Sequence, residues 1–348
     1  MTYLYIETYI NNLEENTENI NVSCISSSPL NYLPDVTRFK NLQILNCSNN
    51  QLTKLPTLNE SLQILNCSNN LLVTLPTLSK YLYILNCGNN QLRSLPTLNE
   101  NLQKLYCSTN QLTKLPTLNT KLQTLSCDNN QLTKLPSLNA NLTSIYCHNN
   151  LLSLLPSLNA NLQVLCCHTN QLTFLPSLNV NLQILNCHNN QLTDLPSLNE
   201  NLEDLYCHNN QLTELPTLNI NLDMLFCTNN QLTKLPTLNK NLRTLYCSNN
   251  QLTDLPTLTE SLRLLTYDYN PIYDIINSDN IFIINKKLKI LHTFRHLYYC
   301  LKFKKQFRDL LWKKIREPKI MKNYHPSYLD KLLIDDNDDL YMVLDNWL

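Results

Sequence analysis

The chain has 348 residues, and 27 Lys and Arg residues balance 27 Asp and Glu residues, so its formal net charge is zero. A balanced charge argues against a protein that binds nucleic acid over its whole surface. The chain has a single glycine, Gly88. Phosphate-binding loops of the Rossmann and Walker types need several glycines close together, so these nucleotide-binding classes are excluded.

Residues 1–40 are predicted to form a polar, partly helical lead followed by a degenerate capping repeat. The lead lacks the basic start and apolar block of an export signal. In the degenerate repeat, which we place between Ile20 and Pro34, Val22 and Cys24 fit the inward positions of a strand, and Ser27 replaces a recurring asparagine. An atypical first repeat is what a cap needs, because it closes the core on its outer side.

Residues 41–272 repeat a twenty-residue pattern almost letter for letter. Steps of twenty from Leu42 to Leu262 give twelve strand segments. Each repeat has six apolar positions, a fixed asparagine and a fixed proline. In the first repeat these are Leu42, Leu45, Cys47, Leu52, Leu55, Leu58, Asn50 and Pro56.

Each repeat reads as one coil of a solenoid. Leu45 and Cys47 face inward from a short strand, and stacked strands form a parallel sheet on the concave side. Twenty residues leave no room for a helix on the way back, and Pro56 favours an extended, polyproline-like return. The Asn50 column is expected to satisfy backbone groups in the turns. No repeat buries its leucines alone, so stability is collective.

Eleven of the fourteen cysteines form a column from Cys47 to Cys247. Parallel neighbours lie about 4.8 Å apart, whereas a disulfide needs about 3.8 Å between Cβ atoms. We therefore expect reduced, buried thiols, which implies a reducing compartment.

The array is expected to end at Tyr267, which replaces the cysteine, and at Pro271, which removes a backbone donor that a following repeat could have used. Residues 273–348 are predicted to be helical, with Pro318 breaking the helix and Pro326 starting a short helix to Leu333. Residues 286–322 contain 13 Lys and Arg residues, and the tail then turns acidic. We expect the helical region to pack an apolar stripe on the last repeat; the stripe is Ile284, Leu288, Leu291, Phe294, Leu297, Leu301, Phe303, Phe307, Leu310 and Leu311.

Function is expected at the outward strand positions, because the other columns are structural. Aromatic residues gather there in the second half of the array, as on a protein-binding surface, although tyrosine also suits an exposed strand. A histidine column lies beside them. The candidate partner-binding residues are Tyr106, Tyr146, His148, His168, His188, Tyr206, His208, Phe226 and Tyr246.

The histidine column admits three interpretations. Two imidazoles and Cys166 could approach one Zn²⁺ or Cu²⁺ ion, or the four histidines could form a pH-sensitive patch. Recent duplication of a repeat with a tolerated histidine explains the column as well. We therefore predict no bound metal and no cofactor. Glu203, Asp204 and Asp223 hint at a basic partner. We find no hydrolase motif and no supported nucleophile–base pair, so no enzymatic activity is predicted.

The repeat matches L-x-x-L-x-L-x-x-N-x-L, with cysteine at the third apolar position, and is identified as a leucine-rich repeat. Leu-Pro after the asparagine also resembles bacterial effector repeats, some of which precede a ubiquitin-ligase domain. That domain is far larger than the remaining tail, and Cys300 lacks its Cys-x-Asp context. Twenty-residue Cys-containing repeats and a tail with Arg316-Glu317-Pro318-Lys319-Ile320 and Tyr324-His325-Pro326 resemble the leucine-rich-repeat proteins of large amoeba-infecting, mimivirus-type DNA viruses. This resemblance implies an interaction protein in host cytoplasm.

We therefore predict a solenoid of the α/β class with 12–13 short parallel strands, an extended convex side and a small helical C-terminal region. The predicted function is a non-enzymatic scaffold that binds a partner protein on its concave face. The alternatives are an adaptor whose residues 286–322 bind nucleic acid or an anionic membrane surface, and the metal site. The protein is expected to be intracellular, not secreted, and without a transmembrane segment.

Overall fold

The structure is a computed structural model that describes residues 2–23 and 29–324. Contacts divide the chain into two compact units, residues 1–284 and residues 285–348. The predicted short helix from Pro326 to Leu333 and the acidic tail lie outside the described residues.

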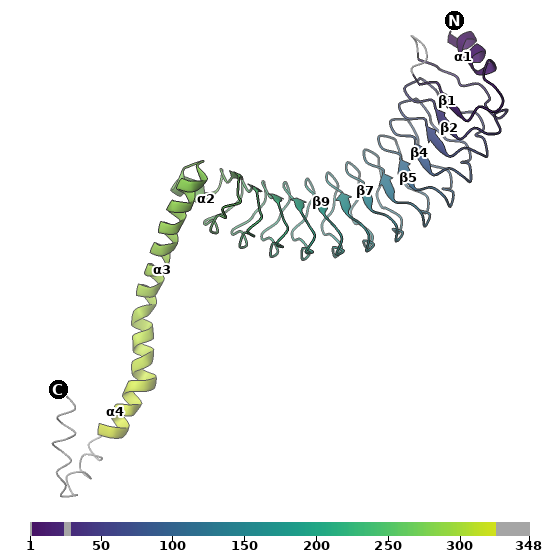
Figure 1. Cartoon of the computed structure of the whole chain (residues 1–348). Helices are drawn as coiled ribbons and strands as arrows, with labels where there is room; N and C mark the ends of the chain where they lie inside the picture. Colours follow the sequence, from purple (N-terminus) through teal and green to yellow (C-terminus); the bar gives the residue numbers. More distant parts are fainter. Residues whose placement is uncertain (1, 24–28, 325–348) are drawn as a thin grey trace, which may run out of the picture. The chain divides into compact units, whose positions relative to one another are not determined.

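The first unit is built around one parallel sheet whose thirteen strands, among the described residues, follow each other in sequence order (Figure 1). Helix α1 (Thr2–Asn11) precedes the sheet, as the partly helical lead predicts. Neighbouring strands are exactly twenty residues apart from β2 onward, as the register Leu45 to Leu65 illustrates. The strands are β1 (Asn19–Asn21), β2 (Ile44–Asn46), β3 (Ile64–Asn66), β4 (Ile84–Asn86), β5 (Lys104–Tyr106), β6 (Thr124–Ser126), β7 (Ser144–Tyr146), β8 (Val164–Cys166), β9 (Ile184–Asn186), β10 (Asp204–Tyr206), β11 (Met224–Phe226), β12 (Thr244–Tyr246) and β13 (Leu264–Thr266).

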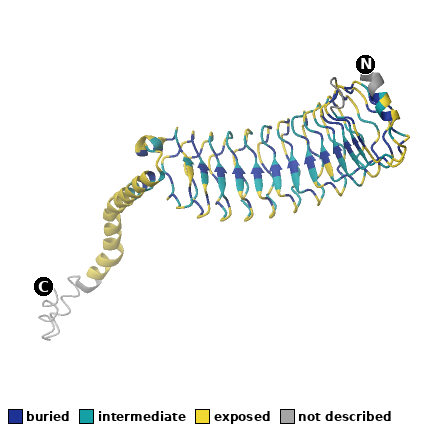
Figure 2. Cartoon of the chain, turned by 45° about the horizontal axis from the view of Figure 1, so that its top comes forward, coloured by how far each residue is buried: buried dark blue, intermediate teal, exposed yellow. Residues whose placement is uncertain are grey.

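The core lies behind the sheet, and the predicted leucine columns fill it. Leu42, Leu45, Cys47 and Leu52 are 0% exposed, and Leu58 is 7% exposed. No helix interrupts the return from one strand to the next between β2 and β13. Figure 2 shows the result as alternating buried and half-buried positions along the strands. The predicted solenoid fold is confirmed.

The asparagine column is the hydrogen-bond ladder that the sequence predicts. Asn150, for example, donates to the carbonyl oxygens of Cys127 and Cys147, at 3.1 Å each. Its own carbonyl oxygen accepts the N–H of Leu132 at 2.9 Å. Each amide thus ties one coil to the coil before it and satisfies buried backbone groups that water cannot reach.

A second column, one residue earlier, holds the turn in the left-handed region. Residue 49 and its eleven equivalents have φ between 50° and 57°. Asparagine is the residue other than glycine that accepts this conformation most readily, which explains its recurrence. The exceptions are Thr109, Thr169 and Tyr269.

The cysteine column is buried and free of disulfides in the described residues. Each of its eleven members is 0% exposed. Burial raises the pKa of the Cys47, Cys87, Cys187 and Cys227 thiols to about 12, because a thiolate loses its hydration there. The expected burial of the cysteine column is confirmed.

The register of the capping repeat differs from the prediction. Ile20 pairs with Leu45, so Ile20 and Val22 take the inward positions that we assigned to Val22 and Cys24. Both are 0% exposed. Ile20 lies 25 residues before Leu45 rather than twenty, so the first repeat is longer than the others and its strand lies two positions earlier than predicted.

Helix α2 (Pro271–Ile276) ends the array, with Pro271 in its first turn. In every other repeat the N–H at this position bonds to the preceding repeat, as Gln251 does to Leu232. Proline cannot donate, and the N–H of Ile272 bonds to Leu252 instead, at 2.9 Å. The missing donor therefore concerns the preceding repeat and not a following one. Ile272 and Ile276 are buried.

The C-terminal helices differ from the prediction in two respects. Helix α3 (Ile281–Leu311) passes through a π-helical turn, η1 (Trp312–Arg316), into α4 (Glu317–Tyr324), so Pro318 does not break the helix. The wider turn, in which the N–H of Glu317 bonds to Trp312, puts Pro318 in the first turn of α4, where proline is tolerated. The predicted apolar stripe is buried only at Ile284 and Leu288, and from Phe294 onward its members are exposed (Figure 2).

Candidate partner-binding surface

The candidate site is the outer side of the sheet, which we call the strand face. It consists of three columns of outward side chains, at residues 44, 46 and 48 and their equivalents every twenty residues. Backbone hydrogen bonds between successive repeats hold these columns in register, for example from Cys227 N–H to Tyr246 O at 2.8 Å. Side chains that are twenty residues apart in sequence are therefore direct neighbours in space.

Three of the predicted aromatic residues form a continuous cluster, which we call the aromatic cluster. The rings of Tyr206 and Phe226 stack with centroids 4.8 Å apart. Phe226 meets Tyr246 edge to face at 4.6 Å. The hydroxyl of Tyr206 lies 3.8 Å from the sulfur of Met224. All three rings are half-buried, so each keeps accessible area beside its packed face.

Tyr106 and Tyr146 do not join this cluster. The Ser126 rung separates them, and neither makes a ring contact within the described part of the chain. Burial, then Cys166 and then Tyr106, raises the pKa of Tyr146, so its hydroxyl stays protonated at neutral pH.

The four predicted histidines form a regular stack, which we call the histidine stack. The ring centroids of His148, His168, His188 and His208 are 4.2, 4.2 and 4.1 Å apart, and the planes are within 17° of parallel. At one end, Nε2 of His148 lies 3.6 Å from a carboxylate oxygen of Asp128. In the middle, Nδ1 of His188 lies 2.5 Å from the side-chain oxygen of Asn186.

Burial lowers the pKa of His168, His188 and His208 and so favours their neutral form. Burial lowers the pKa of His168 to about 4, with the neighbouring histidines adding to the effect and Asp128 opposing it. Burial and the same neighbours lower the pKa of His188 to about 4. A second positive charge about 4 Å away is repelled by about 4 kcal/mol near a protein surface, so adjacent rings resist charging together.

The stack does not gather donors around one point. An imidazole nitrogen donates its lone pair in the plane of the ring, and in parallel rings these directions run side by side. No group of three His, Cys, Asp or Glu residues in the described ranges is arranged to hold a metal ion. Cys166 is half-buried, and burial followed by Asp128 raises its pKa to about 11, so it is a thiol at neutral pH.

The predicted acidic residues lie next to the aromatic cluster. Burial raises the pKa of Asp204, and the carboxylates of Asp223 and Glu203 raise it further. Asp223 lies 3.6 Å from the guanidinium of Arg243, a partly exposed pair that contributes little to stability. A shallow hollow of about 350 Å³ lies between Glu203, Asp223 and Arg243.

One nucleophile–base pair that the sequence did not indicate does meet in space. The sulfur of Cys300 lies 3.5 Å from Nδ1 of His296, one turn apart on α3. Both residues are exposed and line none of the hollows described here. The expectation concerned a supported pair, in which a third group orients the base, and it stays a prediction.

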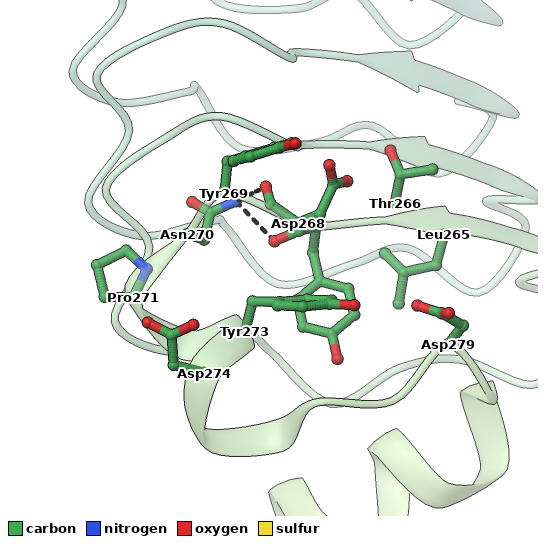
Figure 3. A pocket seen from close by; sticks show the side chains of 10 residues that line it. Leu265, Thr266, Asp268, Tyr269, Asn270, Pro271, Tyr273, Asp274 and Asp279 are labelled. Atoms are coloured by element: carbon green, nitrogen blue, oxygen red, sulfur yellow. Dashed lines mark hydrogen bonds between the residues drawn. The ribbon is translucent and has the colours of Figure 1, made fainter.

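A larger hollow of about 970 Å³, which the sequence did not indicate, lies at the C-terminal end of the array (Figure 3). Its walls come from the last strand, the turn after it, α2 and Asp279. The sequence signal for this hollow is the change from the repeat pattern at Tyr267 and Pro271. Where the repeat pattern ends, the last strand has no following strand to pair with its outer edge.

Comparisons with known proteins agree with this geometry. The family described as Leucine Rich repeats (2 copies) matches residues 180–220 and 220–260. YopM from Yersinia enterocolitica is 32% identical with a TM-score of 0.66; the match covers 74% of this chain and 61% of that one. YopM from Yersinia pestis, described as a leucine-rich effector protein, is 35% identical with a TM-score of 0.64 over 74% of this chain and 79% of that one. The chain is a leucine-rich-repeat protein.

A third similar structure is also described by its cysteines. The functional domain of InlJ from Listeria monocytogenes, which includes a cysteine ladder, is 27% identical with a TM-score of 0.54, over 69% of this chain and 60% of that one. The chain thus spans less than two thirds of the length of the Y. enterocolitica YopM and InlJ structures. A search of curated proteins finds no match. None of the described helices combines the length and apolarity of a membrane span.

Proposed function

We propose that this leucine-rich-repeat protein is a non-enzymatic scaffold that binds a partner protein on the strand face, with the aromatic cluster at the centre of the contact. The observation that carries the proposal is the packed but accessible set of rings of Tyr206, Phe226 and Tyr246. Rigid tyrosine and phenylalanine rings supply contact area at a low cost in conformational entropy, and interface hot spots are enriched in tyrosine.

Charge supports a partner with a basic patch. Asp204 lies on β10 with Tyr206, and Glu203 and Asp223 directly precede β10 and β11. The raised pKa of Asp204 reflects the mutual repulsion of these carboxylates as well as burial, and a cationic group from a partner would relieve the repulsion. The histidine stack extends the surface along the neighbouring repeats with polar rings.

We propose that the protein acts inside a cell, as an effector-type protein in host cytoplasm. The eleven buried free thiols support a reducing compartment. YopM of Yersinia pestis is described as an effector protein, and the array resembles it over the repeats. The virus-type resemblance of the tail points to the same compartment.

The test compares proteins captured from a cell lysate by three forms of the chain. Tyr206→Ala/Phe226→Ala/Tyr246→Ala should lose specific partners that the wild type captures. Tyr81→Ala/Phe174→Ala removes exposed aromatic rings that lie outside the strand face, and it should retain these partners. If the triple variant and the wild type capture the same proteins, the aromatic cluster is not the contact.

A second candidate function rests on the exposed basic helices. Residues 296–321 are all exposed, and Lys and Arg residues alternate there with hydrophobic ones. We propose that this segment binds an anionic partner. The test measures binding of the full chain to DNA and to vesicles that contain phosphatidylserine. Binding that weakens as salt rises and fails in Lys302→Gln/Lys304→Gln/Lys305→Gln supports it, and indifference to both probes eliminates it.

A further inference from the structure

The outer edge of β13 has two backbone N–H groups whose equivalents in the repeats of β2 to β12 all bond to the next repeat. The N–H of Cys247 donates to Thr266 at 2.8 Å, and the N–H of Asn249 donates to Asp268 at 2.9 Å. The equivalent donors in the last repeat are the N–H groups of Tyr267 and Tyr269. No strand in the described ranges lies beyond β13 to accept them. An open strand edge of this kind is a template for another strand.

The chain closes its apolar core without covering this edge. The ring of Tyr267 takes the place of the next cysteine and lies 5.1 Å from the ring of Tyr273. Its hydroxyl donates to the carbonyl of Ser278 at 2.7 Å. Helix α2 thus seals the apolar end, while residues 265–269 still line an open hollow.

The hollow beside the edge is acidic and aromatic (Figure 3). Asp268, Asp274 and Asp279 line it, and none of its ten lining residues is Lys or Arg. Tyr273 forms another part of the wall, and Tyr269 is 79% exposed at its rim. Carboxylates and aromatic faces together favour a cation such as a lysine or arginine side chain.

We propose that the edge of β13 and this hollow bind an extended, basic segment of a partner protein. The segment adds to the sheet as one more strand and accepts hydrogen bonds from the N–H groups of Tyr267 and Tyr269. Side chains of a strand alternate between its two faces, so lysine or arginine at every second position reaches the carboxylates of Asp268, Asp274 and Asp279. This contact shares Thr266 and Asp268 with the end of the strand face, but it does not depend on the rings of the aromatic cluster.

Other occupants fit the end less well. A nucleic acid or a phosphorylated peptide would meet three carboxylates without a countercharge. An apolar helix satisfies its own backbone and would leave the N–H groups of Tyr267 and Tyr269 unbonded. An extended basic segment satisfies both the edge and the charge.

The experiment measures amide hydrogen exchange in the full chain, with a synthetic peptide of about eight residues that alternates valine and lysine. At saturating peptide the amides of Tyr267 and Tyr269 should exchange about tenfold more slowly. The amides of Cys247 and Asn249 already bond to the next repeat, so their exchange should not change. Absence of protection at Tyr267 and Tyr269 would overturn the proposal.

Two controls separate strand addition from simple charge attraction. The same peptide with alternate amides N-methylated keeps its charge but cannot pair, so it should give no protection; equal protection would refute strand addition. Asp268→Asn/Asp274→Asn/Asp279→Asn should weaken peptide binding about tenfold or more, whereas Glu200→Gln/Glu214→Gln/Glu260→Gln, which removes the same charge elsewhere, should not. Asp274→Asn/Asp279→Asn serves if the triple variant does not fold. Unchanged affinity in the Asp variants would refute the acidic contact.

Discussion

In each coil, one residue after the strand adopts the left-handed backbone conformation, which is unfavourable for most residue types. Most repeats place asparagine there, but Thr109 and Thr169 hold β-branched side chains at a φ of 53°. A left-handed conformation costs a residue about 1–2 kcal/mol unless it is glycine or, to a lesser degree, asparagine. These two threonines are therefore local sites of strain.

Thr109→Asn should stabilise the protein by about 1 kcal/mol, because asparagine relieves this strain. Urea unfolding followed by circular dichroism would measure the effect as a higher midpoint. Thr113→Asn makes the same substitution in the same repeat at a position with an ordinary φ, and we expect no gain from it. Equal effects of the two substitutions would contradict the strain argument.

Asn150→Ala should destabilise the protein by about 1–3 kcal/mol. The substitution leaves the buried N–H of Leu132 without its partner, which costs about 1–3 kcal/mol. It also removes one of two amide donors from the carbonyls of Cys127 and Cys147, which keep those of Asn130 and Asn170. Gln131→Ala changes an exposed residue of the neighbouring turn and is the control. A loss below that of Gln131→Ala would show that water replaces the amide.

At the scale of the element, the histidine stack couples the second half of the sheet to pH. The unfolded chain takes up protons on His168 and His188 near pH 6.5, but the folded chain does so only near pH 4. Between these values the unfolded state binds more protons, so stability falls as pH falls from about 6.5 to about 4.

His168→Ser/His188→Ser should reduce this loss of stability, because serine is accepted at Ser48 and Ser108 in the same column and does not titrate. Urea unfolding of the wild type at pH 7.5 and pH 5 gives the reference drop in free energy. Gln163→Ser/Gln183→Ser changes the same two repeats without removing a titrating group, and its drop should match that of the wild type. An unaltered drop in the histidine variant would place the pH dependence elsewhere.

The elements were predictable from the sequence where the repeat is regular. Leu45 and Asn50 recur at a fixed spacing, and that spacing alone determines inward positions and parallel register. Prediction was wrong where the period stops: at Val22, where extra residues shift the register, and at Pro318, where a π-helical turn absorbs the proline. The position of Tyr206 beside Phe226 followed from the strand register. The hollow at β13 could not be predicted in this way, because it depends on which backbone groups the last coil leaves unbonded.

At the scale of the whole molecule, the array is a sum of equal coils, so its length should be adjustable. Deleting residues 141–160 removes one full coil and joins Ala140 to Asn161 in register. The shortened chain should still unfold cooperatively in urea, with a modestly lower midpoint, since each coil contacts only its neighbours. Deleting residues 141–150 removes half a coil, and that chain should lose the cooperative transition. If both deletions behave alike, the twenty-residue unit is not the structural unit.

The column from Cys47 to Cys247 has a consequence for refolding. In the native coil each sulfhydryl is shielded from oxidants, but in the denatured chain all eleven become reactive together at even intervals. Any two of them can then form a disulfide, and most of these disulfides would close loops that are incompatible with the native coil. Recovery after denaturation should therefore require a reductant, and heating in air should trap the chain irreversibly.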